Sequence, residues 1–205
     1  STYEIEDSAA NITASTDTLM QNGTIKVDVT DTDVNASIGN TLAAFTADIE
    51  FDVSDTAANI ATQIAAGNGT NGTGYGADSL EDAGSVVVES GSAVLASQAE
   101  SIQDLVNYSG GDIDITDSAA NLISAGDHVL NVTGVDTVTV NAAGTGSTVT
   151  AQDGAILAGF TADVEFDVVD DVSDLKAIMG QNDAASYLTE ANSITVDNGS
   201  GDRVV

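Results

Sequence analysis

The sequence predicts an α/β fold, a solenoid of short parallel strands alternating with short helices, with an all-β portion around residues 128–150. Three observations predict it. Runs in which apolar and acidic residues alternate recur along the chain, as in half-buried strands. Equivalent strand positions (Ile5, Val27 and Phe51) lie 22 and then 24 residues apart, a period typical of repeat proteins. One short phrase also closes three of these runs, as DSAANI at 7–12, DTAANI at 55–60 and DSAANL at 117–122.

The alternating runs predict the strands. They lie at 2–6, 24–29, 48–53, 85–89, 112–116, 128–132, 135–140, 163–168 and 193–197. Their apolar members should face the core, and those expected to do so are Ile25, Val27, Val29, Ile49, Phe51, Val53, Ile113, Ile115, Val164, Phe166 and Val168. We expect right-handed crossovers between parallel strands, as in nearly all strand–helix–strand units.

Alanine-rich stretches with helical spacing follow most of these strands, for example Ile60 and Ile64 after DTAAN, and the apolar residues within 92–107. In the repeated phrase, we expect the Asp to end the strand and cap the helix that follows. The two alanines should let the first helical turn lie close against the sheet. The Asn residues either hydrogen-bond neighbouring repeats or face solvent. They are Asn11, Asn59 and Asn121.

A longer echo indicates internal duplication. LAAFTADIEFDVSDTAANI (42–60) and LAGFTADVEFDVVDDVSDL (157–175) match at 11 of 19 positions. We therefore expect residues 1–205 to form one repeat domain, cut from a longer chain, with a flexible loop inserted at 67–84 around GNGTNGTGYG. The chain has eight Asn-X-Ser/Thr sequons. They either arise by chance in a chain rich in Asn and Thr or mark glycosylation sites of a surface protein. They begin at Asn11, Asn22, Asn35, Asn68, Asn71, Asn107, Asn131 and Asn198.

The charge of the chain restricts its partners. It has 33 acidic residues against Lys26, Lys176 and Arg203, and a net charge of −30. Nucleic acids are excluded as partners, because no basic footprint exists for phosphates, and an anionic membrane surface is disfavoured for the same reason. No apolar run is long enough to span a bilayer, so membrane insertion is not expected. Self-repulsion of this size needs salt or bound cations, which favours an extracellular or cell-surface location.

The chain lacks the residues that common catalytic sites need. There is no Cys, and His128 is the only histidine, so neither a catalytic triad nor a Cys/His zinc site can be built. Carboxylate pairs are abundant, but four Phe, four Tyr and no Trp leave little to stack a sugar. The sequence predicts a protein that is not an enzyme.

The D[ST]AAN phrases, with their preceding strands and following Ala-rich helices, resemble the strand–helix repeats of very large bacterial cell-surface and exported proteins. These include surface-layer-like, adhesin-like and hemolysin-type calcium-binding proteins. The resemblance implies a repeat fold and a surface role. The Gly-rich calcium nonapeptide G-G-x-G-x-D of the secreted group is absent, and SGGDIDITD at 109–117 does not match it. Calcium binding through that motif is therefore not implied.

Calcium is nevertheless the expected cofactor. In parallel strands stacked about 4.8 Å apart, the outward positions form an acidic face interrupted by Lys26. Oxygen-ligated calcium would neutralise such a face. The predicted ligands form two clusters, Asp28, Asp31 and Asp33, and Asp112, Asp114 and Asp117. The alternative is a solvated acidic face that is screened by salt.

Two functions remain. The first is a non-enzymatic structural module of a surface layer, matrix filament or adhesin, which self-associates or continues into further repeats and is stabilised by divalent cations. The second is a binding module whose acidic repeat face recognises a glycan, a cationic protein or a mineral surface. Concentration-dependent assembly would favour the first function, and saturable ligand binding by a monomer the second.

Overall fold

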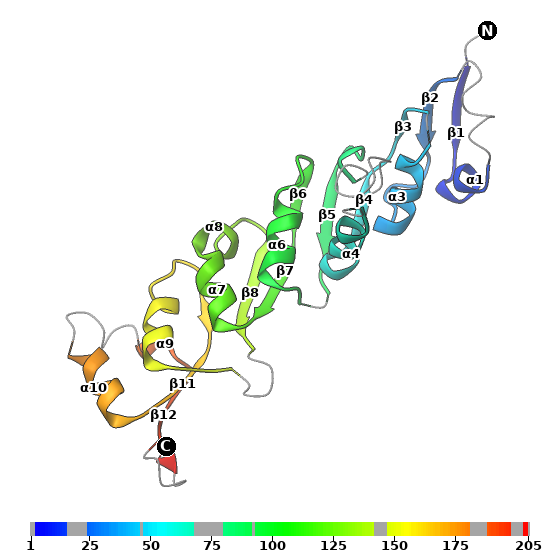
Figure 1. Cartoon of the computed structure of the whole chain (residues 1–205). Coiled ribbons are helices and arrows are strands. Elements are labelled where there is room, and N and C mark those ends of the chain that lie inside the picture. Colours follow the sequence, from blue (N-terminus) through cyan, green and yellow to red (C-terminus); the bar gives the residue numbers. More distant parts are fainter. Residues whose placement is uncertain are drawn as a thin grey trace. The chain divides into compact units, whose positions relative to one another are not determined.

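The computed structural model describes residues 3–15, 24–45, 47–67, 80–91, 93–141, 147–180, 188–197 and 203–204. Their contacts form two compact units, which are described separately. Unit 1 comprises Ser1–Ser92 with Gln98–Ile113, and unit 2 comprises Ala93–Ser97 with Asp114–Val205. Both are mixed α/β, with short helices between short strands that pair mainly in parallel (Figure 1).

Unit 1 contains two three-stranded sheets, with the strand orders β1-β2-β3 and β4-β5-β6, in which all neighbours are parallel. Helix α3 packs on both α1 and α4. The elements are β1 (Tyr3–Asp7), α1 (Ala9–Ala14), β2 (Thr24–Val29), α3 (Ala36–Ala43), β3 (Ile49–Glu50), β4 (Val53–Thr56), α4 (Ala57–Gly67), β5 (Val86–Glu89), most of α6 (Ala96–Gln103) and β6 (Tyr108–Gly111).

Unit 2 contains the sheets β10-β8-β7 and β13-β12-β11-β9. Strand β11 pairs in parallel with β9 and β12, whereas β13 is antiparallel to β12. Helix α9 packs on α7 and α10. The elements are β7 (Ile113–Asp117), α7 (Ala119–Ala125), α8 (Asp127–Leu130), β8 (Val135–Val140), β9 (Thr148–Val149), α9 (Ala151–Leu157), β10 (Val164–Glu165), β11 (Asp167–Asp170), α10 (Val172–Met179), the 3-10 helix η1 (Leu188–Glu190), β12 (Ser193–Asp197) and β13 (Arg203–Val204).

The expected all-β portion around 128–150 is wrong at its start, because 127–130 form helix α8 instead of a strand. Gly126 has φ +62°, which ends α7 and allows a second helix to begin at once. Asp127 lies in the first turn of α8, where its charge favours the helix. Strands β8 and β9 follow, and residues 142–146 lie outside the described residues.

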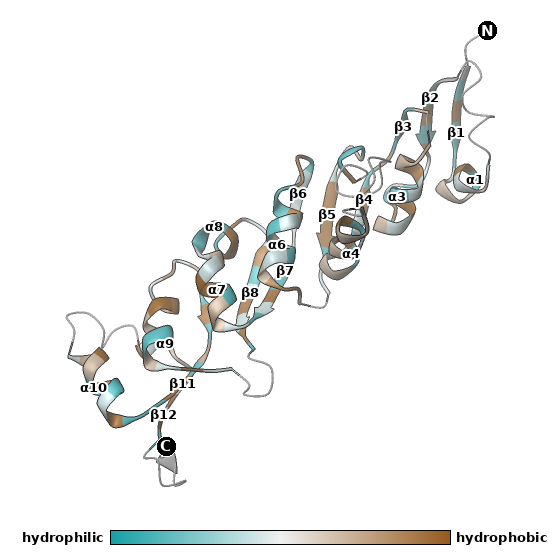
Figure 2. Cartoon of the chain, viewed as in Figure 1, coloured by the Kyte–Doolittle hydropathy of each residue, from teal (hydrophilic) through white to brown (hydrophobic). Residues whose placement is uncertain are grey.

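The core follows the predicted alternation, and Figure 2 shows hydrophobic and hydrophilic residues alternating along the strands. Val29 is only half-buried, and the side chain of Ile25 lies outside the described residues. Of the expected loop at 67–84, residues 68–79 also lie outside them, whereas Leu80 and Ala83 are buried. The buried members of the predicted core are Val27, Ile49, Phe51, Val53, Ile113, Ile115, Val164, Phe166 and Val168.

Three segments share one local structure, and we call them the double repeats: 34–60, 94–122 and 149–175. Each begins with a Val that forms a parallel bridge to the strand 19 to 21 residues later, and a helix begins two residues after that Val. The bridged pairs are Val34–Val53, Val94–Ile115 and Val149–Val168. The echo read from the sequence lies within the first and third double repeats.

Helix and strand residues are matched in size within the double repeats. A Cβ added to Gly39 would lie 2.8 Å from Cγ2 of Val53 and 3.2 Å from Cε2 of Phe51. The equivalent Gly154 would bring a Cβ to 3.0 Å from Cε2 of Phe166. A side chain at this helix position would therefore crowd both the Phe and the Val two residues after it, which favours glycine there.

In the second double repeat, the helix residue is larger and the residue facing it is smaller. Ala99 stands at the position of the helix glycine, and Ile113 stands at the position of Phe. Both side chains are fully buried. A larger helix residue thus accompanies a smaller strand residue, which keeps the packed volume similar.

We predict that Gly39→Ala lowers the free energy of unfolding by about 1–2 kcal/mol, because overpacking outweighs the gain of about 1 kcal/mol in helix propensity. The loss should be smaller when Phe51→Ile is also present. Urea denaturation of the four proteins in this double-mutant cycle measures the coupling. Ser37→Ala, at an exposed position of the same helix, is the control and should change stability little. Equal losses in both backgrounds would contradict the size-matching explanation.

Candidate functional site

Aspartate carboxylates tie the starts of four helices, α1, α3, α6 and α9, to later parts of the chain. In each case Oδ2 of an Asp accepts a hydrogen bond from the first helical N–H of the preceding helix, which has no acceptor within its own helix. We call this contact the aspartate bridge. The donor–acceptor pairs are Ala9–Asp31 (2.7 Å), Ala36–Asp55 (3.0 Å), Ala96–Asp117 (3.1 Å) and Ala151–Asp170 (2.9 Å).

The other carboxylate oxygen, Oδ1, explains why the repeated phrase contains both an Asp and an Asn. Oδ1 of Asp117 accepts the N–H of Ser118 at 2.7 Å and the side-chain amide of Asn121 at 2.7 Å. Asp7 and Asp55 accept from the equivalent two groups. The Asn amides therefore bond the Asp of their own phrase and not a neighbouring repeat.

The Ser or Thr after each Asp is the residue that caps the helix. Ser8 and Ser118 are N-cap residues, and their hydroxyl oxygens accept the N–H three residues on. Thr56 accepts the equivalent N–H of Asn59 at 3.3 Å. The prediction that the Asp caps its own helix is wrong, because the carboxylate lies one residue earlier and faces another helix.

Asp117 is the buried charged side chain of the described residues, with 7 % of its surface exposed. Its three hydrogen-bond donors are all N–H groups, from Ala96, Ser118 and Asn121. A buried carboxylate is tolerated only when it is bonded in this way. Removing it would leave the buried N–H of Ala96 without an acceptor and would also remove the acceptor of Ser118 and Asn121.

Asp117→Ala should lower the free energy of unfolding by about 3 kcal/mol, as expected when bonds to a charged group are lost and their donors remain. Asp112→Ala is the matched control, because Asp112 is exposed and lies five residues away on the same stretch. That variant should change stability by less than about 0.5 kcal/mol. Denaturant unfolding of both variants measures the difference, and similar losses would refute a special role for Asp117.

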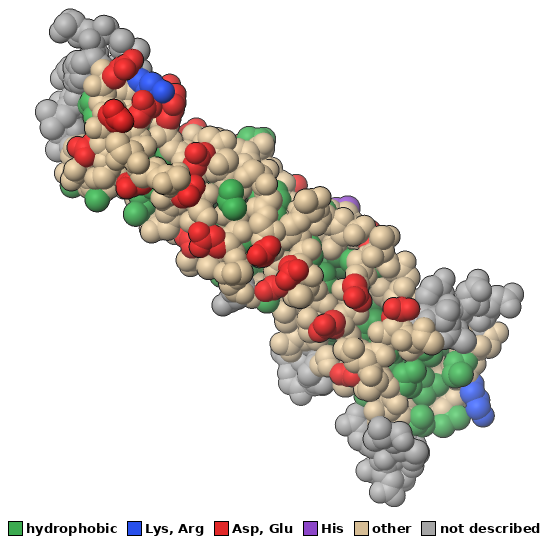
Figure 3. All heavy atoms as spheres, turned by 180° about the vertical axis from the view of Figure 1, so that it is seen from behind, with side chains coloured by type: hydrophobic (Ala, Val, Ile, Leu, Met, Phe, Trp, Pro, Cys, Tyr) green, Lys and Arg blue, Asp and Glu red, His purple; other side chains and the backbone are tan. Residues whose placement is uncertain are grey.

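Neighbouring strands place a cation or hydroxyls beside the outward acids, which Figure 3 shows spread over the face in view. Lys26 lies 2.7 Å from Glu50 and 3.0 Å from Asp28. The hydrogen bonds that Lys26 donates to Glu50 and then to Asp28 raise its pKa above the usual value. Four other acids accept from Ser or Thr hydroxyls, in the pairs Ser85–Asp52 (2.7 Å), Ser54–Glu89 (2.8 Å), Thr137–Asp114 (2.6 Å), Ser193–Asp167 (2.5 Å) and Ser147–Asp167.

The predicted calcium ligands have different surroundings. Asp31 and Asp117 form aspartate bridges, and Asp28 pairs with Lys26. Asp114 accepts the hydroxyl of Thr137, while Asp33 and Asp112 are exposed. In neither set do the three acidic side chains lie close enough together to bind one ion. Among the described residues, three acidic side chains do lie that close in another part of the chain. Calcium binding at the predicted residues stays a prediction.

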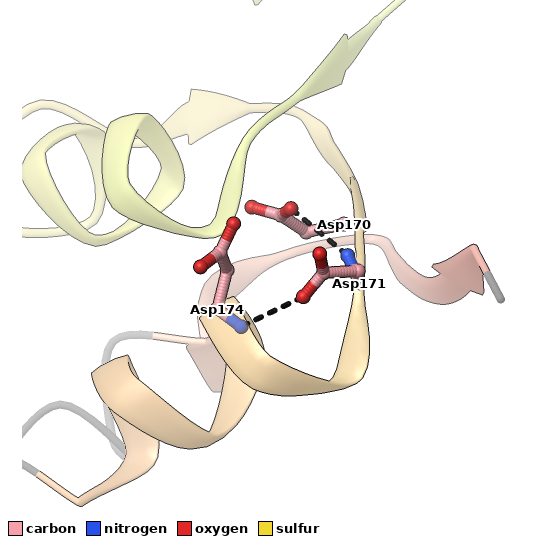
Figure 4. Close-up of side chains that lie close together, drawn as sticks. All are labelled: Asp170, Asp171 and Asp174. Atoms are coloured by element: carbon pink, nitrogen blue, oxygen red, sulfur yellow. Dashed lines mark hydrogen bonds between the residues drawn. The ribbon is translucent and has the colours of Figure 1, made fainter. Parts of the chain in front are cut away.

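The three-carboxylate cluster consists of Asp170, Asp171 and Asp174, each with an oxygen within 4.8 Å of the others. Asp170 ends β11, and the other two belong to the start of α10 (Figure 4). Asp171 is the N-cap and accepts the N–H of Asp174 at 2.9 Å and the hydroxyl of Ser173 at 2.6 Å. These bonds, the Ser173 hydroxyl foremost, lower the pKa of Asp171.

Asp174 is the unusual member of the cluster. It stands where Asn11, Asn59 and Asn121 stand in the repeated phrase, and a carboxylate has no N–H to offer Asp170. The charges of Asp171 and then Asp170 raise its pKa. An acid with a raised pKa gains stabilisation as the pH falls through that pKa and loses it as the pH rises. A proton or a cation could therefore replace the missing amide.

No known protein family, curated protein or solved structure matches this chain. Within the described ranges, no helix has the length and apolar character needed to cross a bilayer.

Proposed function

We propose that this chain is a non-enzymatic structural repeat module, a solenoid belonging to an extracellular surface layer, matrix filament or adhesin. The observation that carries the proposal is the aspartate bridge, which recurs four times with sequence separations of 19 to 22 residues. One contact thus fixes the starts of four helices, α1, α3, α6 and α9, against Asp residues 19 to 22 positions later in the chain. Nearest-neighbour contacts of this kind are how repeat proteins hold together.

The use made of polar side chains supports a structural role. The Asp, Asn, Ser and Thr of the repeated phrases hydrogen-bond backbone N–H groups and one another at the helix starts. Side chains bonded in this way fix the points where a strand ends and a helix begins. A net charge of −30 suits an environment rich in salt or divalent cations, which supports the extracellular location.

The position of strand β1 and the bonding of Asp7 at its end support the proposal that the chain self-associates. Strand β1 lies at the edge of the β1-β2-β3 sheet. Asp7 at its end accepts from Ser8 and Asn11 through Oδ1. Its Oδ2, the oxygen that forms the bridge in the other copies, has no partner among the described residues. A second copy could place a helix start against Asp7 and a strand beside β1, as successive repeats do within the chain.

We expect sedimentation velocity to show association that increases with protein concentration. Asp7→Ala should weaken association because it removes the acceptor for the incoming helix N–H. Asp112→Ala, an exposed acid of the same unit, should associate like the natural chain, and circular dichroism checks that both variants are folded. A chain that stays monomeric at every concentration, or equal association of Asp7→Ala, would contradict the proposal.

Calcium is proposed to stabilise the module, and the Asp170–Asp171–Asp174 cluster provides the sharpest test. The melting temperature of the natural chain should be higher in millimolar calcium than in chelator at constant ionic strength. Asp174→Asn restores the amide of the repeated phrase and should reduce this rise. If sodium chloride gives the same rise, or if both proteins respond equally to calcium, binding at this cluster is ruled out.

A groove of about 380 Å³ favours the second candidate function, glycan binding. It lies at the first turns of α3 and α4. Amides and hydroxyls predominate in its lining, and such groups suit the hydroxyls of a sugar. The lining residues are Asn35, Ser37, Asp55, Asn59, Thr62 and Gln63. Monomeric chains that bind a glycan saturably would favour this function over the structural one.

A further inference from the structure

Four of the Asn-X-Ser/Thr sequons lie in the described part of the chain, and three of them have side chains that hold the fold. Asn11 donates to Oδ1 of Asp7 at 2.6 Å, and Asn35 accepts the N–H of Ile38 at 2.9 Å as the N-cap of α3. Both N–H groups of the half-buried Asn107 donate to backbone carbonyls, at 2.7 Å and 2.8 Å. These amides have structural partners.

The fourth sequon is Asn131-Val132-Thr133, and it differs from the other three in the bonding of its Asn side chain. Asn131 and Thr133 are both exposed. Among the described residues, no hydrogen bond engages the side chain of Asn131. Its backbone is no longer helical, at φ −111° and ψ 45°, directly after α8. The N–H of Val135 donates to the carbonyl of Val132 at 3.0 Å, so the sequon lies in a tight surface turn.

We propose that Asn131 is an acceptor for an N-linked glycan. A transferase must reach the amide nitrogen and the hydroxyl two residues on together, and an exposed turn presents both, whereas a helix or a buried strand start does not. The amide nitrogen bonds to C1 of an oligosaccharide carried on a polyprenyl diphosphate. The C1–oxygen bond breaks, the diphosphate leaves with the bonding electrons, and the amide gives one proton to a base of the transferase.

This inference rests on the proposed extracellular location, since glycan transfer to sequons accompanies export. It does not depend on self-association, which sedimentation tests separately. Attachment at Asn131 would add a bulky hydrophilic group beside α8 without disturbing any hydrogen bond described for the fold. Attachment at Asn107 would instead replace one of the two N–H groups that hold residues 80–83.

The test incubates the folded, purified chain with an oligosaccharyltransferase that accepts Asn-X-Ser/Thr and with a polyprenyl-diphosphate oligosaccharide. Glycopeptide mass spectrometry then maps the sites, with the urea-unfolded chain and a short acceptor peptide treated in parallel. We expect the Asn131 peptide of the folded chain to gain the mass of one oligosaccharide. The Asn107 peptide should gain it only after unfolding.

Thr133→Ala should abolish the gain at Asn131, and Thr133→Ser should retain it, because the transferase needs the hydroxyl. Circular dichroism confirms that both variants are folded. The proposal is overturned if the folded chain carries no sugar at Asn131 while the acceptor peptide is modified. It is also overturned if folded Asn107 is modified as readily as Asn131, since accessibility would then not select the site.

Discussion

The hydrogen bond from the first N–H of a helix to an aspartate carboxylate about 20 residues later is the contact on which the rest of this structure depends. Helix starts leave backbone N–H groups without acceptors and carry partial positive charge. In this chain an Asp from elsewhere in the sequence meets both needs, as Asp31 does for the helix that begins at Ala9. Because acceptor and donor lie 19 to 22 residues apart, satisfying the helix start also fixes that helix against a later part of the chain.

The same contact explains how so acidic a chain forms a packed fold. Carboxylates at helix starts are stabilised by the helix dipole and by bonds to N–H groups, so they do not simply repel one another. Along the strands, hydroxyls such as those of Ser85 and Thr137 lie beside the outward acids, and Lys26 neutralises two of them. Asp174 departs from this arrangement, because it places a third carboxylate where the other phrases have an amide.

Local patterns predicted much of the fold, while non-local partners escaped prediction. Alternation located the strands with buried residues such as Val27 and Val168, because it depends only on which side chains face the core. Helix α8 was missed because DHVLNV has no period that separates a short helix from a strand, and β6 was missed because Gly110 and Gly111 adopt positive φ. The role of Asp117 was hidden, since its partner Ala96 is 21 residues away and only the strand register brings them together. Aligning DDVSDL with DTAANI would have revealed Asp174.

Hydrogen exchange at the helix starts tests the central claim most directly, because the first N–H groups of a helix ordinarily exchange fast. Two-dimensional NMR of the native chain in D₂O should show protected amides at Ala36 and Ala151, which donate to Asp55 and Asp170. The next amide of α3, that of Ser37, has no such acceptor among the described residues and should exchange faster than that of Ala36. Equally fast exchange at Ala36 and Ser37 would show that the carboxylates do not hold the helices, and the account would fail.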